Sequence, residues 1–175
     1  AEECTTADPL DSSLVEQWWE DRNDVAGLAA ITKKGFVFDT MEVTVSWSNL
    51  DSCYRSVLDV VGAMDGVRVV SAHQSHAYSD GACLYFTFAA RPEDPTVREA
   101  WYVAAWDVAA RAALSAGASL SHHHGVGLNR ARFMAEALGS GFEVLVTLKE
   151  ALDPQGILNP GKMGLPDRFG EVFWP

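Results

Sequence analysis

Basic side chains, cysteines and long apolar runs are all scarce in this sequence. Among its 175 residues, 13 lysines and arginines stand against 24 aspartates and glutamates, which gives a net charge of -11 at pH 7. Because contacts with phosphate groups need a basic face, this balance argues against nucleic acid as a partner. No apolar run approaches the roughly 20 residues that a membrane-spanning helix needs.

Cysteine occurs only at Cys4, Cys53 and Cys83, and no two of these have Cys-x-x-Cys spacing. An odd number of scattered thiols is typical of a reducing compartment and not of a disulfide framework. We therefore expect a cytoplasmic protein. The chain opens on Ala1 and two glutamates, without an initiator methionine and without the basic and apolar segments of a signal peptide. We interpret this opening as a sign that the sequence is a piece of a longer polypeptide.

What is present is the composition of a globular domain. Hydrophobic residues make up 48% of the chain and charged residues 21%, and this length suits one domain. Alternation of apolar and polar residues predicts strands, and apolar residues at helical spacing predict helices. The expected order is strand 41–47, helix 49–64, strand 67–72, strand 82–90 and helix 96–116.

This order predicts an α+β fold with a ferredoxin-like antiparallel sheet and helices on one face. Two shorter stretches, 131–138 and 142–152, are expected to form a C-terminal helical segment. Upstream, Ser12 or Ser13 is expected to cap a short helix, whereas residues 22–35 have no clear pattern. We assign residues 1–13 to an exposed lead-in, 14–165 to the domain and 166–175 to a C-terminal tail.

Periodicity also predicts which side chains face the core. In the first strand the inward apolar series ends with Trp47, and Glu42 falls in the opposite, polar series, with no partner that demands an acid/base role. In the third strand Tyr85 shares a face with Cys83 and Thr87. That face could line a pocket, or it could simply be the drier of two half-polar faces. In the second long helix the predicted inward residues are Val97, Trp101, Ala104, Ala105, Val108 and Ala112.

The densest group of chemically active side chains runs from Ser121 to Arg130. His122, His123 and His124 stand in a row, and imidazoles need hydrogen-bond partners when they are buried. The row is a poor metal site, because consecutive rings diverge on a helix and only alternate rings share a face on a strand. Proton transfer suits imidazole better, and a solvated loop is the alternative.

Other basic and imidazole side chains nearby are weaker candidates. The glycines after the histidines form Gly-x-Gly-x-x-Arg, a weak match to a dinucleotide fingerprint. A glycine turn that opens a helix carrying Arg130 and Arg132 could receive a phosphate, or both arginines could face solvent. His73 and His76 lie three positions apart and could touch a ligand or each other, although such a pair is usually structural.

Two blocks of the sequence, and the distance between them, resemble a known family. Residues 81–86 read Gly-Ala-Cys-Leu-Tyr-Phe, and residues 117–127 read Gly-Ala-Ser-Leu-Ser-His-His-His-Gly-Val-Gly. Both are similar to blocks of the alkylglycerone-phosphate synthases, which are FAD-dependent enzymes of the vanillyl-alcohol-oxidase type. Residues 156–162 resemble the C-termini of FAD-linked oxidases in general, and the resemblance extends over residues 15–165.

The resemblance implies that the chain is the C-terminal, substrate-side domain of an FAD-dependent oxidoreductase. Most contacts with FAD would come from an N-terminal FAD-binding domain of the same polypeptide, which this chain lacks, so the isolated chain is expected to be inactive. The chemistry of the family is exchange of an acyl group for a fatty alcohol without net redox change, a step towards ether lipids. The implied substrate is a small or lipid-like molecule.

The resemblance also assigns roles to particular residues. Tyr85 matches the active-site tyrosine of the family, and His122, His123 and His124 match the histidine run beside the flavin. The implied roles are proton abstraction and substrate positioning. The residues expected to contact the cofactor are His124, Gly125 and Asn159.

The chain departs from the family in a stretch that serves substrate recognition. The synthases have a functional arginine where residues 25–30 of this chain read Val-Ala-Gly-Leu-Ala-Ala. Arg22 and Arg130 are the candidate substrate-binding arginines that remain. The alternative function within the superfamily is oxidation of an alcohol or a 2-hydroxy acid by the flavin.

Related 2-hydroxy-acid dehydrogenases bind a metal through a His-x-x-Asp-Gly-Asn-x-x-His type pattern and a Glu-His-Gly block. The counterparts here are residues 76–82 and 123–125, and an aromatic strand replaces the second ligand histidine. We therefore expect no metal. A further alternative is a binding module that keeps the fold without the chemistry, and a homodimer is left open as the assembly.

Overall fold

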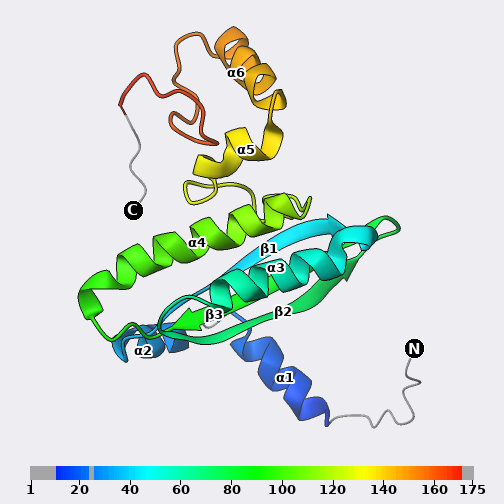
Figure 1. Cartoon of the computed structure of the whole chain (residues 1–175), viewed down its shortest axis with the longest axis vertical. Helices are drawn as coiled ribbons and strands as arrows, with labels where there is room; N and C mark the ends of the chain where they lie inside the picture. Colours follow the sequence, from blue (N-terminus) through cyan, green and yellow to red (C-terminus); the bar gives the residue numbers. More distant parts are fainter. Residues whose placement is uncertain (1–10, 24–25, 171–175) are drawn as a thin grey trace. The chain divides into compact units, whose positions relative to one another are not determined.

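The computed structural model describes residues 11–23 and 26–170. The beginning of the expected lead-in and the end of the expected tail lie outside the described residues. The chain divides into two compact units, residues 1–34 and 35–175, and Figure 1 labels their elements. The first unit contains α1 (Ser12–Asp21) and α2 (Ala26–Lys33).

The cap of α1 differs from the sequence prediction by one or two residues. The carboxylate of Asp11 caps this helix by accepting a hydrogen bond from the backbone N–H of Ser13 at 2.8 Å. The prediction of Ser12 or Ser13 as the cap is wrong, since a carboxylate oxygen serves as well as a hydroxyl at this position. α2 lies in the stretch that has no clear periodicity.

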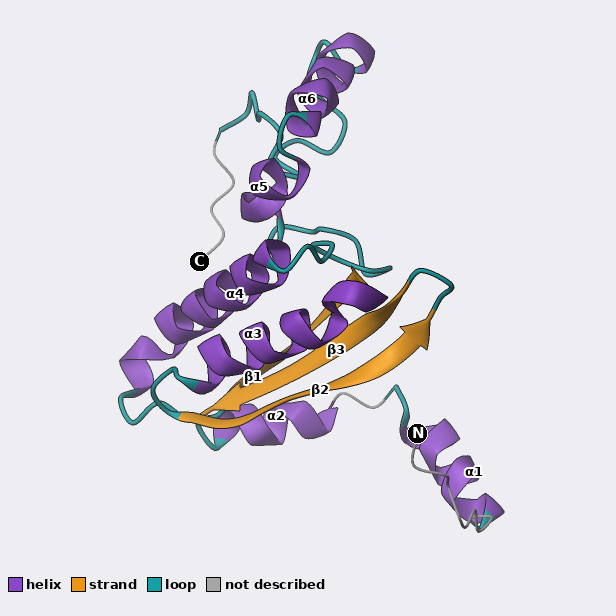
Figure 2. Ribbon diagram, turned by 45° about the vertical axis from the view of Figure 1, so that its right-hand side comes forward, coloured by secondary structure: helices purple, strands orange, loops and turns teal. Residues whose placement is uncertain are grey.

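The second unit contains a three-stranded antiparallel sheet with β3 in the middle, in the order β1-β3-β2. Two helices, α3 and α4, cover the same face of this sheet (Figure 2). The predicted order of elements and the α+β class are confirmed. The bounds are β1 (Val37–Ser46), α3 (Leu50–Gly62), β2 (Val67–Ala77), β3 (Gly81–Ala90) and α4 (Arg98–Ser115), with short turns η1 (Trp47–Asn49) and η2 (Pro95–Val97).

The hydrophobic core lies between the sheet and these two helices. Alternate residues of β1 and β3 point into it, as the two-residue period of a strand requires. Burial of one phenylalanine side chain contributes about 1.5–3 kcal/mol, so the central strand is the main anchor of the unit. The buried strand residues are Met41, Val43, Val45, Leu84, Phe86 and Phe88.

Some predicted core positions are wrong. Trp47 lies beyond the end of β1 and is 44% exposed, and its indole N–H donates to the carbonyl of Tyr78 at 3.0 Å. In α4 the buried face includes Trp106 in addition to Trp101, whereas Val97 is 43% exposed. Most positions of this helix are apolar or small, so spacing alone does not select the buried face.

The C-terminal part of the second unit is helical, as the sequence predicts. Asp153 ends the last helix, and its carboxylate accepts the backbone N–H groups of Ile157 at 3.0 Å and Leu158 at 2.9 Å while pairing with Lys149. In the described ranges no helix has the length and apolar character to span a bilayer. The bounds are η3 (Ala131–Phe133), α5 (Met134–Leu138) and α6 (Gly141–Leu152).

Candidate functional site

The face of the sheet turned away from α3 and α4 carries polar side chains, because successive strand residues alternate between the two faces. The register places Glu42 of β1 opposite Tyr85 of β3, and Tyr85 opposite His73 of β2. We call this surface the polar face. Its members on the three strands are Thr40, Glu42, Thr44, His73, Cys83, Tyr85 and Thr87.

Tyr85 lies on the polar face and not in the core, as the alternation in its strand predicts. Its hydroxyl donates to Oγ1 of Thr40 at 3.0 Å, and its ring stacks on His73 with centroids 5.0 Å apart. The side chain is partly buried. The phenol is therefore held in one orientation without being sealed off from a ligand.

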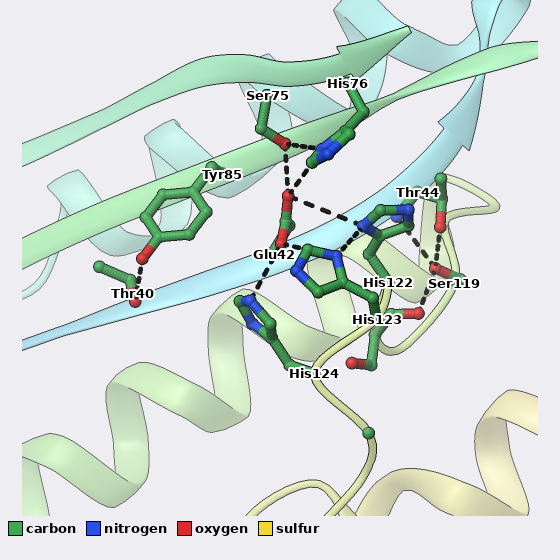
Figure 3. A network of polar contacts seen from close by, with 12 residues as sticks. Thr40, Glu42, Thr44, Ser75, His76, Tyr85, Ser119, His122, His123 and His124 are labelled. Atoms are coloured by element: carbon green, nitrogen blue, oxygen red, sulfur yellow. Dashed lines mark hydrogen bonds and ion pairs between the residues drawn. The ribbon is translucent and has the colours of Figure 1, made fainter. Parts of the chain in front are cut away.

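The histidine segment, residues 121–125, lies beside β1 on this face (Figure 3). Ser119 ties it there, because its N–H donates to the carbonyl of Thr44 at 2.7 Å and its hydroxyl accepts the N–H of Thr44 at 2.9 Å. These two residues are 75 positions apart in the sequence. The backbone N–H and C=O of Thr44, at the edge of β1, are thus both hydrogen-bonded to the residue that leads into the histidine segment.

Glu42 is the centre of the arrangement, with a side chain that is 1% exposed. The hydroxyl of Ser75 donates to Oε1, and Oε2 has no hydrogen-bond partner among the described residues. Four imidazole rings face the carboxylate (Figure 3). The carboxylate oxygens lie 3.3 Å from Nε2 of His124, 3.6 Å from Nδ1 of His123, 3.7 Å from Nδ1 of His76 and 3.8 Å from Nδ1 of His122.

The surroundings of Glu42 favour its charged form. Burial raises the pKa of this carboxyl, but the hydrogen bond from Ser75 and the charges of His123, His124 and His122 outweigh burial and bring the pKa below its usual value. At neutral pH the site therefore contains a carboxylate. Burial also raises the pKa of the neighbouring Cys83 thiol, and the negative charge of Glu42 adds to this effect.

Two tyrosines contact the histidine segment. The hydroxyl of Tyr78 lies 2.7 Å from Nε2 of His122. Tyr85 and His124 meet edge to face with ring centroids 6.3 Å apart. The structure thus brings Tyr85 and the three predicted histidines to one face of one sheet.

The predicted basic residues have other environments. Arg130 lies half-buried with its guanidinium 4.9 Å from the centroid of the Trp106 ring, and burial lowers its pKa although the charge of Asp39 opposes this. Arg132 is exposed and donates to the carbonyl of Val103 at 3.0 Å. Arg22 belongs to the first unit, where its guanidinium lies 3.6 Å from the centroid of the Trp19 ring.

The predicted cofactor contacts lie on two separate elements. Gly125 follows the histidines with a φ of 72°, and a Cβ atom there would have no neighbour within 4 Å. This backbone is therefore open to a ligand. Asn159 lies after α6, at a φ of 43°, and lines a hollow of about 420 Å³ together with apolar side chains such as Leu148 and Leu152.

Sequence reasoning missed Glu42 and Ser75 as members of the site, whereas it named His76 as a residue that could touch a ligand. The alternation of β1 placed Glu42 in the polar series of the strand without a partner, yet side chains of the histidine segment and of β2 surround its carboxylate. The available signal was a carboxylate in register with Tyr85 on the same face. His76 is neither a partner of His73 nor isolated, since its ring lies 5.0 Å from that of His122.

The donor atoms around Glu42 are close enough to share a small cation. Ligand atoms of Glu42, His76, Cys83 and His122 lie within 4.8 Å of one another, as do those of Glu42, His123 and His124. Carboxylate, imidazole and thiolate are all zinc donors. A proton and a divalent cation are therefore both chemically able to neutralise this carboxylate, whereas the sequence predicts no metal.

Comparison with known proteins identifies the family of this domain. Residues 3–163 match the family described as FAD linked oxidases, C-terminal domain. An Escherichia coli protein named uncharacterized FAD-linked oxidoreductase YgcU is 28% identical over 166 residues, covering 87% of this chain and 34% of the relative. Alkyldihydroxyacetonephosphate synthase of Dictyostelium discoideum is 32% identical over 160 residues, covering 88% of this chain and 26% of that enzyme.

A solved structure of an alkyldihydroxyacetonephosphate synthase is similar to the chain with a TM-score of 0.54 and 29% sequence identity. The similarity covers 84% of this chain and 25% of the solved one. The chain spans between a quarter and about a third of the length of these relatives.

Proposed function

Since the chain belongs to the family of FAD-linked oxidases, as their C-terminal domain, we propose that it forms the substrate-side wall of a flavin active site. The enzyme would resemble alkylglycerone-phosphate synthase, which is the alkyldihydroxyacetonephosphate synthase of the relatives above. The observation that carries the proposal is that Tyr85 and the histidine segment meet on one polar face around the buried Glu42. The expected partner is an FAD-binding domain of the same polypeptide.

The residues present fit a flavin at this face. His123 and His124 expose 55% and 37% of their side chains, and the backbone at Gly125 and Gly127 has open space where a Cβ would stand. A planar ring system can approach such a backbone closely. We propose that His124 and Gly125 contact the cofactor, with Asn159 adding a contact from the loop after α6.

FAD, when bound, supplies the electron-accepting ring. The chain's own residues would handle protons and orient the substrate. Tyr85 holds its hydroxyl towards Thr40 at 3.0 Å, so the phenol can give or take a proton at a fixed position. The exposed imidazole of His123 can accept a proton from the substrate, and a positioned acid or base of this kind contributes roughly 10²–10⁴-fold to a rate.

A second reaction would use the same groups. Residues 25–30 contain no arginine, and Arg130 is held over Trp106. A site with so few arginines available to pair with a phosphate favours a substrate with fewer negative charges than an acyl-glycerone phosphate. An alcohol or a 2-hydroxy acid that is oxidised by the flavin therefore stays the second candidate, with the proton again taken by an imidazole.

Anaerobic assays of the complete polypeptide with bound FAD would separate these possibilities. Exchange of a labelled acyl group for a fatty alcohol, with the flavin spectrum unchanged after turnover, supports the synthase-like reaction. Bleaching of the flavin by an alcohol or a 2-hydroxy acid supports oxidation. A polypeptide that neither exchanges the acyl group nor shows flavin bleaching would contradict both proposed reactions. The non-catalytic binding module would then be the remaining function.

A further inference from the structure

Tyr85 contacts a neighbour on each of the other two strands of the sheet. Its hydroxyl donates to Oγ1 of Thr40 on β1 at 3.0 Å, and its ring stacks on His73 of β2 with centroids 5.0 Å apart. We infer that Thr40 and His73 are positioning residues, which hold the phenol of Tyr85 with its oxygen presented to a substrate hydroxyl. The orientation of the phenol depends on the contacts of this chain alone. Only its consequence for turnover rests on the proposed function.

The register of the strands explains why the phenol reaches Thr40. Tyr85 lies opposite Glu42 on one side and opposite His73 on the other. Thr40 lies opposite Thr87, two residues further along the same face. Diagonal neighbours of this kind are about 7–8 Å apart, which is within reach of an aromatic side chain. The phenol therefore leans along the sheet, and Figure 3 shows its hydroxyl turned towards Thr40.

Thr40 is itself anchored by hydrogen bonds. Its backbone N–H donates to Oδ1 of Asp39 at 2.7 Å, and Oδ2 of the same carboxylate accepts hydrogen bonds from Tyr102 and Trp106 of α4. All three contacts are partly buried. A group that orients another needs such support, because a loosely held group does not keep the geometry that a reaction requires. The acceptor of the phenol is thus tied to the helix that covers the other face of the sheet.

The direction of the hydrogen bond determines what Tyr85 offers to a ligand. The phenol gives its hydrogen to Thr40, so its oxygen faces a ligand as an acceptor. The matching group on the ligand is a donor, and an alcohol hydroxyl is such a donor. The fatty alcohol of the synthase-like reaction carries this group, as do the alcohol and the 2-hydroxy acid of the second candidate reaction.

His73 determines the plane of the phenol. The two rings are inclined by only 28°, and stacked aromatic rings attract each other beyond the effect of burial alone. The ring of His124 adds an edge-to-face contact with centroids 6.3 Å apart. Rotation of the phenol out of its plane would break the stack with His73. Because His73 is exposed, it can be replaced without disturbing the core.

Kinetics of the complete polypeptide with bound FAD test the role of Thr40. Thr40→Val has the shape of threonine without the acceptor, and it should lower kcat at least about tenfold with KM and flavin content little changed. Thr40→Ser keeps the hydroxyl and should recover most of the rate. The matched control is Thr87→Val, which removes a hydroxyl from the same face opposite Thr40 and should keep its rate.

A double-mutant cycle shows whether Thr40 acts through Tyr85. If it does, Thr40→Val should have no further effect on kcat in the Tyr85→Phe background, because the hydroxyl that it orients is already absent. Losses that multiply would give Thr40 a separate role and overturn the inference, as would a full rate in Thr40→Val when Tyr85→Phe is slow. A full rate in Tyr85→Phe would instead refute the proposed function of Tyr85, and the orientation of its ring would still be decided by the following measurement.

NMR spectra of the 175-residue chain with ¹³C-labelled tyrosine test the orientation without any turnover. The ring resonances of Tyr85, assigned by their absence from Tyr85→Phe, should be displaced by the neighbouring imidazole. The displacement should disappear in His73→Ala and persist in His73→Phe, whose ring can stack in the same way. In the complete polypeptide the same two variants should respectively lower and retain kcat. Identical Tyr85 resonances in the unmodified chain and in His73→Ala would show that the rings do not stack and would overturn the role of His73.

Discussion

Tyr85 and His124 meet edge to face on the polar face, with ring centroids 6.3 Å apart. Tyr85 comes from the central strand, and His124 comes from the histidine segment beyond α4. Neither side chain is fully buried. Two groups able to move a proton therefore share one accessible surface, and this relationship leads to the first prediction.

Replacement of Tyr85 by phenylalanine, or of His123 by alanine, should lower turnover of the complete polypeptide by about 10²-fold or more. Bound flavin should stay unchanged, because these side chains serve the substrate. Steady-state kinetics together with the flavin absorbance of each variant check this. Thr87→Val, on the same face and strand, is the control that should keep its rate, and full activity of Tyr85→Phe would remove Tyr85 from the mechanism.

Asp39 ties β1 to α4 through a single oxygen. Its Oδ2 accepts the hydroxyl of Tyr102 at 2.7 Å and the indole N–H of Trp106 at 2.9 Å. Asp39→Ala leaves both donors without an acceptor and should lower the free energy of unfolding by roughly 2–4 kcal/mol. Urea unfolding measures this loss of free energy. Asp59→Ala removes an exposed carboxylate and serves as the control. Equal stability of the two variants would show that the contacts of Asp39 do not stabilise the fold.

The helices and strands of the fold could be predicted from local sequence patterns. The buried position of Glu42 at the centre of the site could not. The alternation in β3 separates Tyr85 from Phe86 and Phe88, because a strand turns each successive side chain to the other face. Glu42 looks like an ordinary solvent-facing residue by the same rule. Its burial arises from Ser119 pairing with Thr44 across 75 positions, and no local pattern contains that contact.

Three consecutive histidines are unusual enough to be recognised in the sequence, but the sequence does not predict the direction in which their rings point. As a row they fit neither a helix nor a strand as a metal site, yet an irregular backbone turns all three rings towards one carboxylate. The resemblance to the synthases placed Tyr85 and these histidines in one site, and the structure brings them to one face. It assigned no role to Glu42 or His76, which complete the cluster.

Acid should weaken the C-terminal segment through Asp153. Its hydrogen bond from Lys149 is the largest of the contacts that bring its pKa to about 2, below an ordinary value of 3.8. A group with a depressed pKa stabilises the folded state above its unfolded pKa, and that contribution disappears as pH falls through the folded value. The stability difference between the wild type and Asp153→Asn should therefore be constant above pH 5 and shrink between pH 4 and pH 2.

Denaturant midpoints of both proteins across this pH range provide the measurement. Glu150→Gln, an exposed neighbour on α6, is the matched control. A difference that stays constant down to pH 2 would show that Asp153 does not hold the loop after α6 by its charge.

The two described cysteines should resist thiol reagents in the folded protein. Both are fully buried, and burial raises the pKa of Cys53 to about 11. The thiolate is the reactive form, so a Cys4→Ser variant should react slowly with an aromatic disulfide at pH 8. The same protein should release two equivalents of thiol after unfolding in guanidinium, and fast reaction before unfolding would place a cysteine at the surface.

The structure of the complete polypeptide with bound FAD and a substrate analogue tests the central claim most directly. The account predicts the flavin ring over the polar face, with the Tyr85 hydroxyl and at least one ring of the histidine segment roughly 3 Å from the reacting atoms of the analogue. A flavin bound elsewhere, with Tyr85 and all three histidines beyond hydrogen-bond reach of the analogue, would contradict it.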